Sequence, residues 1–293
     1  MELLRTLAVL AERPGPEHAR LADLLDLPGT PDEATWTQVF VLHLYPYASV
    51  YLGGEGKLGG EARDRIAGFF RALDAIPPAE PDHLPTLLAA HAELAERADT
   101  GDHRAAHAAT TLLHEHLLSW LPLYLGRLQS LAPQPYRSWA RLLTEVLHDQ
   151  ARRYPAPSSD GTTPLPAHLR HAPLVTDPRE GADLPLPEQL LVPARTGFLL
   201  TGADLRRAAR ETSLGLRIGE RRYVLEQLLA QSVPDTLQWL ANHATTTTPG
   251  ALAGWHTVVP DAVDWWQQRA QTTAALLQDL ATEAEEAVIS LVP

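Results

Sequence analysis

The chain contains no cysteine among its 293 residues. This absence excludes a disulfide framework, a thiolate nucleophile and an iron–sulfur cluster held by thiolates. No apolar run reaches the roughly 20 residues that a membrane-spanning helix needs. The N-terminal residues also lack the basic start and small-residue cleavage site of a secretory signal peptide. We therefore expect a protein of the reducing cytoplasm that does not insert into a membrane.

Positive charge is scarce, since 24 Lys and Arg stand against 36 Asp and Glu and the net charge is −12. A surface of this sign repels the phosphate backbone, so we expect no nucleic-acid partner. It is compatible with a basic peptide as partner. Solubility alone also explains an acidic composition and is the interpretation that we prefer, so the charge does not identify the partner by itself.

Runs of β-branched residues are also scarce, whereas Leu and Ala recur at the spacing of three and four that places them on one helix face. The sequence therefore predicts an all-α protein, a multi-helix bundle. Either Thr30 or Asp32 is the candidate N-cap of the third predicted helix, and Asp82 is the candidate for the helix that follows it. The predicted helices cover residues 3–10, 17–25, 32–44, 61–73, 84–94, 102–120, 138–154, 201–212, 220–232, 235–242 and 260–291, and a loop is expected at 245–250.

Proline content divides the chain. Nine prolines lie between Tyr154 and Arg195, with Ser, Thr and Gly among them and little periodicity. Such a composition is typical of a linker or an extended wrapping segment. We expect a helical domain at 1–154, this proline-rich segment at 155–195, and a helical C-terminal part at 196–293 that packs on the first.

Two patterns could indicate an enzyme. The residues 54–59 match G-x-G-x-x-G, but a dinucleotide site needs a second parallel strand, and the chain continues instead into DAIPPAEPDHL. Leu58 follows Lys57 where a P-loop needs Ser or Thr. We interpret the segment as a glycine turn.

Histidines form the second pattern. His103 and His107 lie four apart on a predicted helix, and His114 and His116 follow. Two of these with a carboxylate could bind zinc, although HExxH is absent and 114 and 116 face different sides of a helix. No G-x-S-x-G elbow accompanies Ser119. A metal- or nucleotide-dependent enzyme that uses these histidines or the glycine loop stays the alternative hypothesis.

The most informative stretches are PYASVYLGGEGKL at 46–58 and EPDHL at 80–84. The first ends an apolar helix and turns through glycines. The second places three titratable groups ahead of a helix, and such groups in an apolar bundle cost desolvation unless they are capped, paired or used. A structural interpretation is also open, in which Asp82 caps the helix and His83 belongs to its first turn.

Together with the later segment His116-Leu117-Leu118-x-Trp120-Leu121-Pro122, these stretches resemble the TorD/DmsD/NarJ family of cytoplasmic chaperones for molybdenum-containing enzymes. The three pieces occur in the family's order, and the likeness covers about residues 32–155. The segment 193–222 also resembles a C-terminal part of longer members. The long proline-rich insert and the tail depart from the shorter members, which leaves the client open.

The resemblance implies an all-helical chaperone without catalytic residues or a cofactor. Its partners would be the apo form of a molybdoenzyme subunit and that subunit's twin-arginine signal peptide, bound before cofactor insertion and export, and a homodimer is possible. Carboxylates can accept two hydrogen bonds from an arginine, and an apolar groove can hold the segment that follows. The peptide-binding residues that the resemblance implies are Pro46, Ser49, Tyr51, Glu80, Asp82, His83 and Trp120.

Overall fold

A computed structural model describes residues 1–157 and 165–290. Within these ranges every regular element is helical and no strand occurs, which confirms the all-α prediction. Residues 158–164 of the expected proline-rich segment and Leu291 at the end of the last expected helix lie outside the described residues. None of the described helices is both long and apolar enough to cross a bilayer.

The chain forms two compact units. The first unit comprises Met1–Ala172 and Ala251–Val263, and the second comprises Pro173–Gly250 and Asp264–Pro293. The chain therefore leaves the first unit after Ala172, returns to it at Ala251–Val263 and then continues in the second unit. The three-part division expected at residues 154 and 195 stays a prediction.

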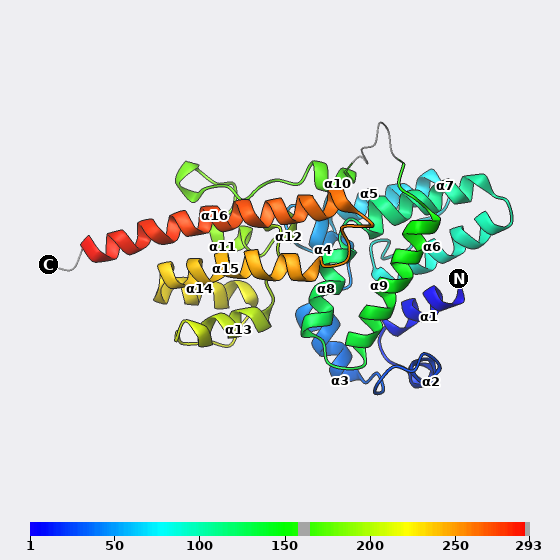
Figure 1. Ribbon diagram of the computed structural model, residues 1–293, viewed down its shortest axis with the longest axis horizontal. Helices are drawn as coiled ribbons and strands as arrows, with labels where there is room; N and C mark the ends of the chain where they lie inside the picture. The colour runs from blue at the N-terminus through cyan, green and yellow to red at the C-terminus, as the bar shows by residue number, and fades with distance from the viewer. Residues whose placement is uncertain (158–164, 291–293) are drawn as a thin grey trace. The chain divides into compact units, whose positions relative to one another are not determined.

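Helices pack pairwise in the first unit, where α1 lies against α6, α6 against α7 and α8 against α9 (Figure 1). The elements of this unit are α1 (Glu2–Leu10), α2 (Pro16–Leu24), α3 (Glu33–Trp36), η1 (Thr37–His43), α4 (Ala48–Leu52), α5 (Gly60–Ala72), α6 (Leu84–Asp99), α7 (His103–Thr111), η2 (Leu112–Leu117), α8 (Leu121–Leu131), α9 (Tyr136–Arg153) and α10 (Ala167–Arg170).

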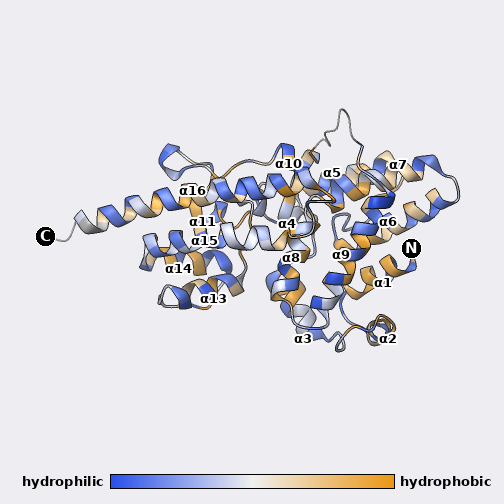
Figure 2. Ribbon diagram, viewed as in Figure 1, coloured by the Kyte–Doolittle hydropathy of each residue, from blue (hydrophilic) through white to orange (hydrophobic). Residues whose placement is uncertain are grey.

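The core of the first unit is built around aromatic side chains. The ring of Phe40 meets those of Tyr136 and Trp139 edge to face, at centroid distances of 5.0 and 5.8 Å. The indole Nε1 of Trp139 donates to the Leu7 carbonyl at 2.9 Å, which ties α9 to α1. Hydrophobic residues cover most of α1 (Figure 2). Such a helix is stable only when it is packed against others.

Two of the expected helices contain wide turns. In η1 the Leu44 amide donates to the Val39 carbonyl, and in η2 the Leu118 amide donates to the Leu113 carbonyl, both at 2.8 Å. A bond between residues five apart is the pattern of a π-helix. The helices expected at 32–44 and 102–120 therefore each begin as α-helix and end in a π-turn. Asp32 and Asp102 cap their first turns, as the side chains accept from backbone amides.

The segment 251–263 completes the first unit. The buried indole of Trp255 meets the His148 ring at 4.4 Å. A Cβ atom added to Gly126 of α8 would lie 2.0 Å from the carbonyl oxygen of Ala251. The two backbones therefore approach as closely as only glycine allows.

The second unit encloses its own apolar core, formed by residues such as Phe198, Leu225, Leu240 and Leu277. Gly197 has φ +79°, and a Cβ there would lie 2.3 Å from the backbone nitrogen of Ala270. The elements of this unit are η3 (Pro178–Glu180), α11 (Leu186–Gln189), α12 (Pro193–Thr196), α13 (Gly202–Glu211) and α14 (Arg221–Gln231), with most of α15 (Val233–Ala251) and of α16 (Pro260–Ser290).

The prediction of a loop at 245–250 is wrong, because helix α15 continues through these residues to Ala251. Pro249 removes one helical amide, yet the threonine run does not end the helix. The hydroxyls of Thr246 and Thr247 donate to carbonyls four residues earlier. Thr248 is fully buried, which shows that packing outweighs the weak helix propensity of threonine here.

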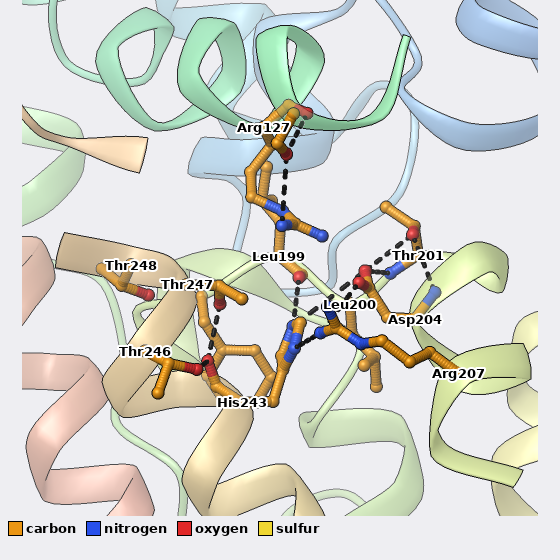
Figure 3. A network of polar contacts seen from close by, with 12 residues as sticks. Arg127, Leu199, Leu200, Thr201, Asp204, Arg207, His243, Thr246, Thr247 and Thr248 are labelled. Carbon is orange, nitrogen blue, oxygen red and sulfur yellow. Dashed lines mark hydrogen bonds and ion pairs between the residues drawn. The ribbon is translucent and has the colours of Figure 1, made fainter. Parts of the chain in front are cut away.

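A buried polar network joins α13 to α15 (Figure 3). Asp204 accepts from the amide and the hydroxyl of Thr201, so that the two form a capping box at the start of α13. Arg207 is hydrogen-bonded to Nδ1 of His243 at 2.9 Å, and the other ring nitrogen of His243 lies 3.2 Å from the Leu199 carbonyl. The Trp239 ring stacks on His243 at 5.0 Å. Because these groups bind one another, we interpret the network as structural.

Burial favours the neutral form of three histidines in the first unit, His91, His116 and His168. Burial lowers the pKa of His91 to about 4, and Nε2 of this residue lies 3.2 Å from the Gln150 amide oxygen. The pKa values of His116 and His168, whose rings are hydrogen-bonded at 3.3 Å, are also lowered by burial. The unfolded chain therefore takes up protons at a higher pH than the folded one does.

Stability should consequently fall as the pH is lowered below the ordinary histidine value of about 6.5. His91 alone should cost about 2 kcal/mol of unfolding free energy between pH 7 and pH 5. Urea unfolding at the two pH values measures this loss. The His91→Gln variant keeps an amide partner for Gln150 but cannot be protonated, so it should lose less. Equal losses in both proteins would contradict the assignment.

Gly126→Ala should destabilise the first unit by about 3 kcal/mol, because the methyl group meets backbone that cannot rotate away. Gly68→Ala in α5 is the matched control, since nothing lies within 4 Å of its added Cβ. The control should be neutral or stabilising by about 0.5–1 kcal/mol. Thermal and urea unfolding compare the two, and equal stabilities would refute the close approach.

Candidate functional site

The two stretches singled out in the sequence lie side by side. The Ala48 amide donates to the Asp82 carbonyl at 2.9 Å, and the Leu84 amide donates to the Pro46 carbonyl at 2.8 Å. Tyr47 and His83 form an isolated antiparallel bridge between these bonds. The turn before α4 is therefore joined to the turn before α6, which places residues 46–49 against residues 80–84.

Asp82 joins the two turns through its side chain as well. Its carboxylate is 2% exposed and accepts a hydrogen bond from the Ser49 amide at 3.2 Å, in the first turn of α4. The Ser49 hydroxyl in turn accepts from the Gly59 amide at 3.1 Å, which holds the end of the glycine turn. A carboxylate near a helix N-terminus is favoured by the unpaired amides there.

Asp82 was expected to cap the helix that follows it, and this prediction is wrong. His83 occupies the N-cap position of α6 and makes no side-chain cap bond. The physical reason is that Asp82 points to the first turn of α4, 33 residues earlier in the chain. Its interaction is therefore long-range.

Three other members of the expected set are buried beneath the turn. The Tyr51 and Trp120 rings are 3% and 0% exposed and stack at 5.0 Å with an interplanar angle of 12°. The Tyr51 hydroxyl donates to the Tyr45 carbonyl, and the Trp120 indole donates to the His116 carbonyl. Pro46 is buried as well. These side chains support the turn from inside, and their assignment as client-binding residues stays a prediction.

The solvent-accessible part of the site consists of Glu80, His83 and Tyr47. The Glu80 side chain is 59% exposed, and its Oε2 lies 3.9 Å from Nδ1 of His83. The rings of Tyr47 and His83 stack at 4.6 Å with an interplanar angle of 25°. The three side chains thus form one continuous surface with a carboxylate at its edge.

The electrostatics of this surface are acidic. Burial raises the pKa of Tyr47 to about 12, and the negative charge of Glu80 adds to the effect. Burial lowers the pKa of His83, against the opposing charges of Glu80, Glu12 and Asp82. His83 is therefore neutral at pH 7, and the carboxylates around it are not compensated by its ring. Arg63 is nearby, and it donates to the Ala79 carbonyl at 3.0 Å.

Two contributors were not among the expected residues. Tyr47 belongs to the quoted stretch, but its pairing with His83 depends on a contact between residues 36 apart. Glu12 follows α1, and its contribution to the site is electrostatic, since its charge acts on the pKa of His83. A local sequence pattern carries no signal for either contact.

The alternative sites expected from the histidines and the glycines are not assembled. Among the residues that the structure describes, no three His, Asp or Glu side chains are grouped to hold a metal ion. His103 and His107 are exposed, while Nε2 of His114 donates to the Tyr154 carbonyl at 2.7 Å. Residues 54–59 connect α4 to α5, and a turn before α6 stands where a dinucleotide site would need its second parallel strand.

Asp82→Ala should lower the unfolding free energy by about 1–3 kcal/mol, because it leaves the buried Ser49 amide without its acceptor. Glu80→Ala is the matched control, since an exposed carboxylate contributes within about 0.5 kcal/mol. Urea unfolding measures both, and amide hydrogen exchange at Ser49 should accelerate in Asp82→Ala alone. Equal stability of the two variants would contradict the anchoring role of Asp82.

Comparison with known proteins gives one family. The model of the family described as "Nitrate reductase delta subunit" matches residues 15–125, a range that contains both turns and Trp120. No curated protein and no solved structure matches the chain. The match overlaps the resemblance expected for residues 32–155 and ends before the second expected likeness at 193–222. Residues 15–125 thus carry the nitrate reductase delta subunit signature, and the predicted family relationship is confirmed there.

Proposed function

We propose that the protein is a chaperone that binds the twin-arginine signal peptide, the apo form, or both, of a molybdenum-containing oxidoreductase subunit. It would assist cofactor insertion and delay export, and would act in the cytoplasm. Proteins of the matched family are chaperones for the maturation of such enzymes. The observation that carries the proposal is the acidic surface of Glu80, His83 and Tyr47 inside the matched segment.

Glu80 is the group proposed to contact an arginine of the signal peptide. An exposed carboxylate can accept two parallel hydrogen bonds from a guanidinium, a geometry that lysine cannot reproduce. The nearby negative charges of Glu12 and Asp82 favour a cationic ligand. Neutral His83 adds no repulsion at pH 7, and the Tyr47 ring that stacks on it offers a face to a planar cation.

Asp82 acts in this proposal as a positioning residue. It is buried, so an arginine cannot reach it without opening the turn. Its bond to the Ser49 amide keeps Tyr47 opposite His83 and leaves Glu80 at the surface. Ser49, Tyr51, Trp120 and Pro46 support the same turn. In this proposal, Asp82 holds the two turns together from inside, and Glu80 contacts the peptide at the surface.

The test is calorimetric titration with twin-arginine signal peptides of molybdoenzyme subunits from the same genome, and with their Lys-Lys versions. Twin-arginine peptides should bind more tightly. Glu80→Gln should weaken binding about 5- to 10-fold, the loss of one exposed charge-assisted contact of about 1 kcal/mol or slightly more.

Glu93→Gln is the matched control, because Glu93 is an exposed glutamate on α6 outside the site. It should bind the peptides like the unaltered protein. Absence of binding by the unaltered protein would refute the signal-peptide proposal. Equal affinities of Glu80→Gln and Glu93→Gln would refute the site.

A further inference from the structure

A partly enclosed cavity of about 270 Å³ lies in the first unit, outside the surface proposed to bind the signal peptide. Residues of α7 and η2 line one side. The other sides are formed by residues 155–157, by Pro166 and by residues 258–262, where α16 begins. None of its lining residues belongs to the peptide-binding set expected from the sequence, although His107 and His114 belong to the histidine pattern noted there. The cavity is built partly by segments beyond the part of the chain that matches the family model.

The inner surface of the cavity is apolar. Leu118, Pro166 and Ala262 are buried at its floor, and Val258 and Val259 form part of its wall. A cavity of this volume is close to the lower end of small-ligand sites, about 300 Å³. Its size therefore suits a small molecule with an apolar body.

The polar groups that line the cavity carry one sign of charge. Glu115 and Asp261 are both half-buried, and among the described residues that line the cavity there is no Lys or Arg. One oxygen of Glu115 accepts from the Ala167 amide at 2.8 Å, which leaves the other carboxylate oxygen for a second donor. A cation placed here would meet two carboxylates without a competing cation.

His114 adds an acceptor to this wall. Its Nε2 donates to the Tyr154 carbonyl at 2.7 Å, so the neutral ring carries its proton there and Nδ1 has a free lone pair. Burial lowers the pKa of His114, which keeps the ring neutral at pH 7. The hydroxyls of Thr110 and Thr111 already donate to carbonyls of their own helix, so they too can only accept from a ligand. The lining is thus rich in acceptors, to which the exposed ring of His107 adds an N–H donor.

We infer that this cavity binds a small organic cation, an amine or guanidine attached to a compact apolar body. The apolar floor takes the body, and Glu115 and Asp261 take the cationic head. The inference does not depend on the proposed chaperone function, because its residues and its ligand are separate from those of the signal-peptide site.

The test uses phenethylamine as the probe, with phenylacetate as its anionic counterpart of similar shape. Saturation-transfer NMR and calorimetry on the full-length protein should detect phenethylamine and show at least 10-fold weaker binding of phenylacetate. The double variant Glu115→Gln/Asp261→Asn, which removes both carboxylates, should weaken phenethylamine binding at least 10-fold. Glu115→Gln retains an oxygen for the Ala167 amide, so the fold should survive.

Thr111→Phe fills the cavity and should abolish binding, with thermal unfolding as the check on its fold. Glu93→Gln should leave binding unchanged. The inference would be overturned if phenethylamine did not bind, or if phenylacetate bound equally well. It would also be overturned if the double variant Glu115→Gln/Asp261→Asn bound phenethylamine as tightly as the unaltered protein. Binding of a capped Phe-Arg peptide without binding of the free amine would also overturn it, since the ligand would then be a polypeptide.

Discussion

The hydrogen bond from the Ser49 amide to the Asp82 carboxylate determines how the candidate site is built. A buried carboxylate without a partner costs several kcal/mol, so this group favours the fold only while α4 presents its first-turn amides to it. Two backbone bonds flank the interaction and align residues 46–49 with residues 82–84. The positions of Tyr47, His83 and Glu80 all follow from this alignment. The arrangement of the exposed side chains thus depends on a buried carboxylate.

Much of the fold could be predicted because the signals that specify a helix lie among residues close together in the sequence. The spacing of Leu4, Leu7 and Leu10 and the capping side chain of Asp102 are features of neighbouring residues, and the structure contains both helices. Helix α8 was not predicted, although Pro122 lies in its first turn, where proline is tolerated because no amide bond is needed. Thr245–Gly250 was assigned to a loop because burial, which decides its helical state, is not visible in composition.

The candidate site could be predicted in part. The two stretches were singled out in the sequence and lie side by side in the structure, but the role of Asp82 depends on a contact across 33 residues. The exposure of Glu80 and the burial of Tyr51 and Trp120 depend on the same packing. Sequence spacing names the residue types that can perform the chemistry. Only the folded structure shows which of these residues are exposed to solvent and which are buried and support the exposed ones.

The return of residues 251–263 to the first unit has a consequence for synthesis on the ribosome. Trp255 and the backbone of Ala251 complete a core whose other parts are made at least about 80 residues earlier, and every residue of the second unit up to Gly250 is translated in between. The first unit therefore emerges with an unfilled space beside α8 and α9 that persists until residues 251–263 have been translated. A nascent chain at that stage exposes an unfinished apolar surface, so this protein is itself vulnerable to premature association while it is being made.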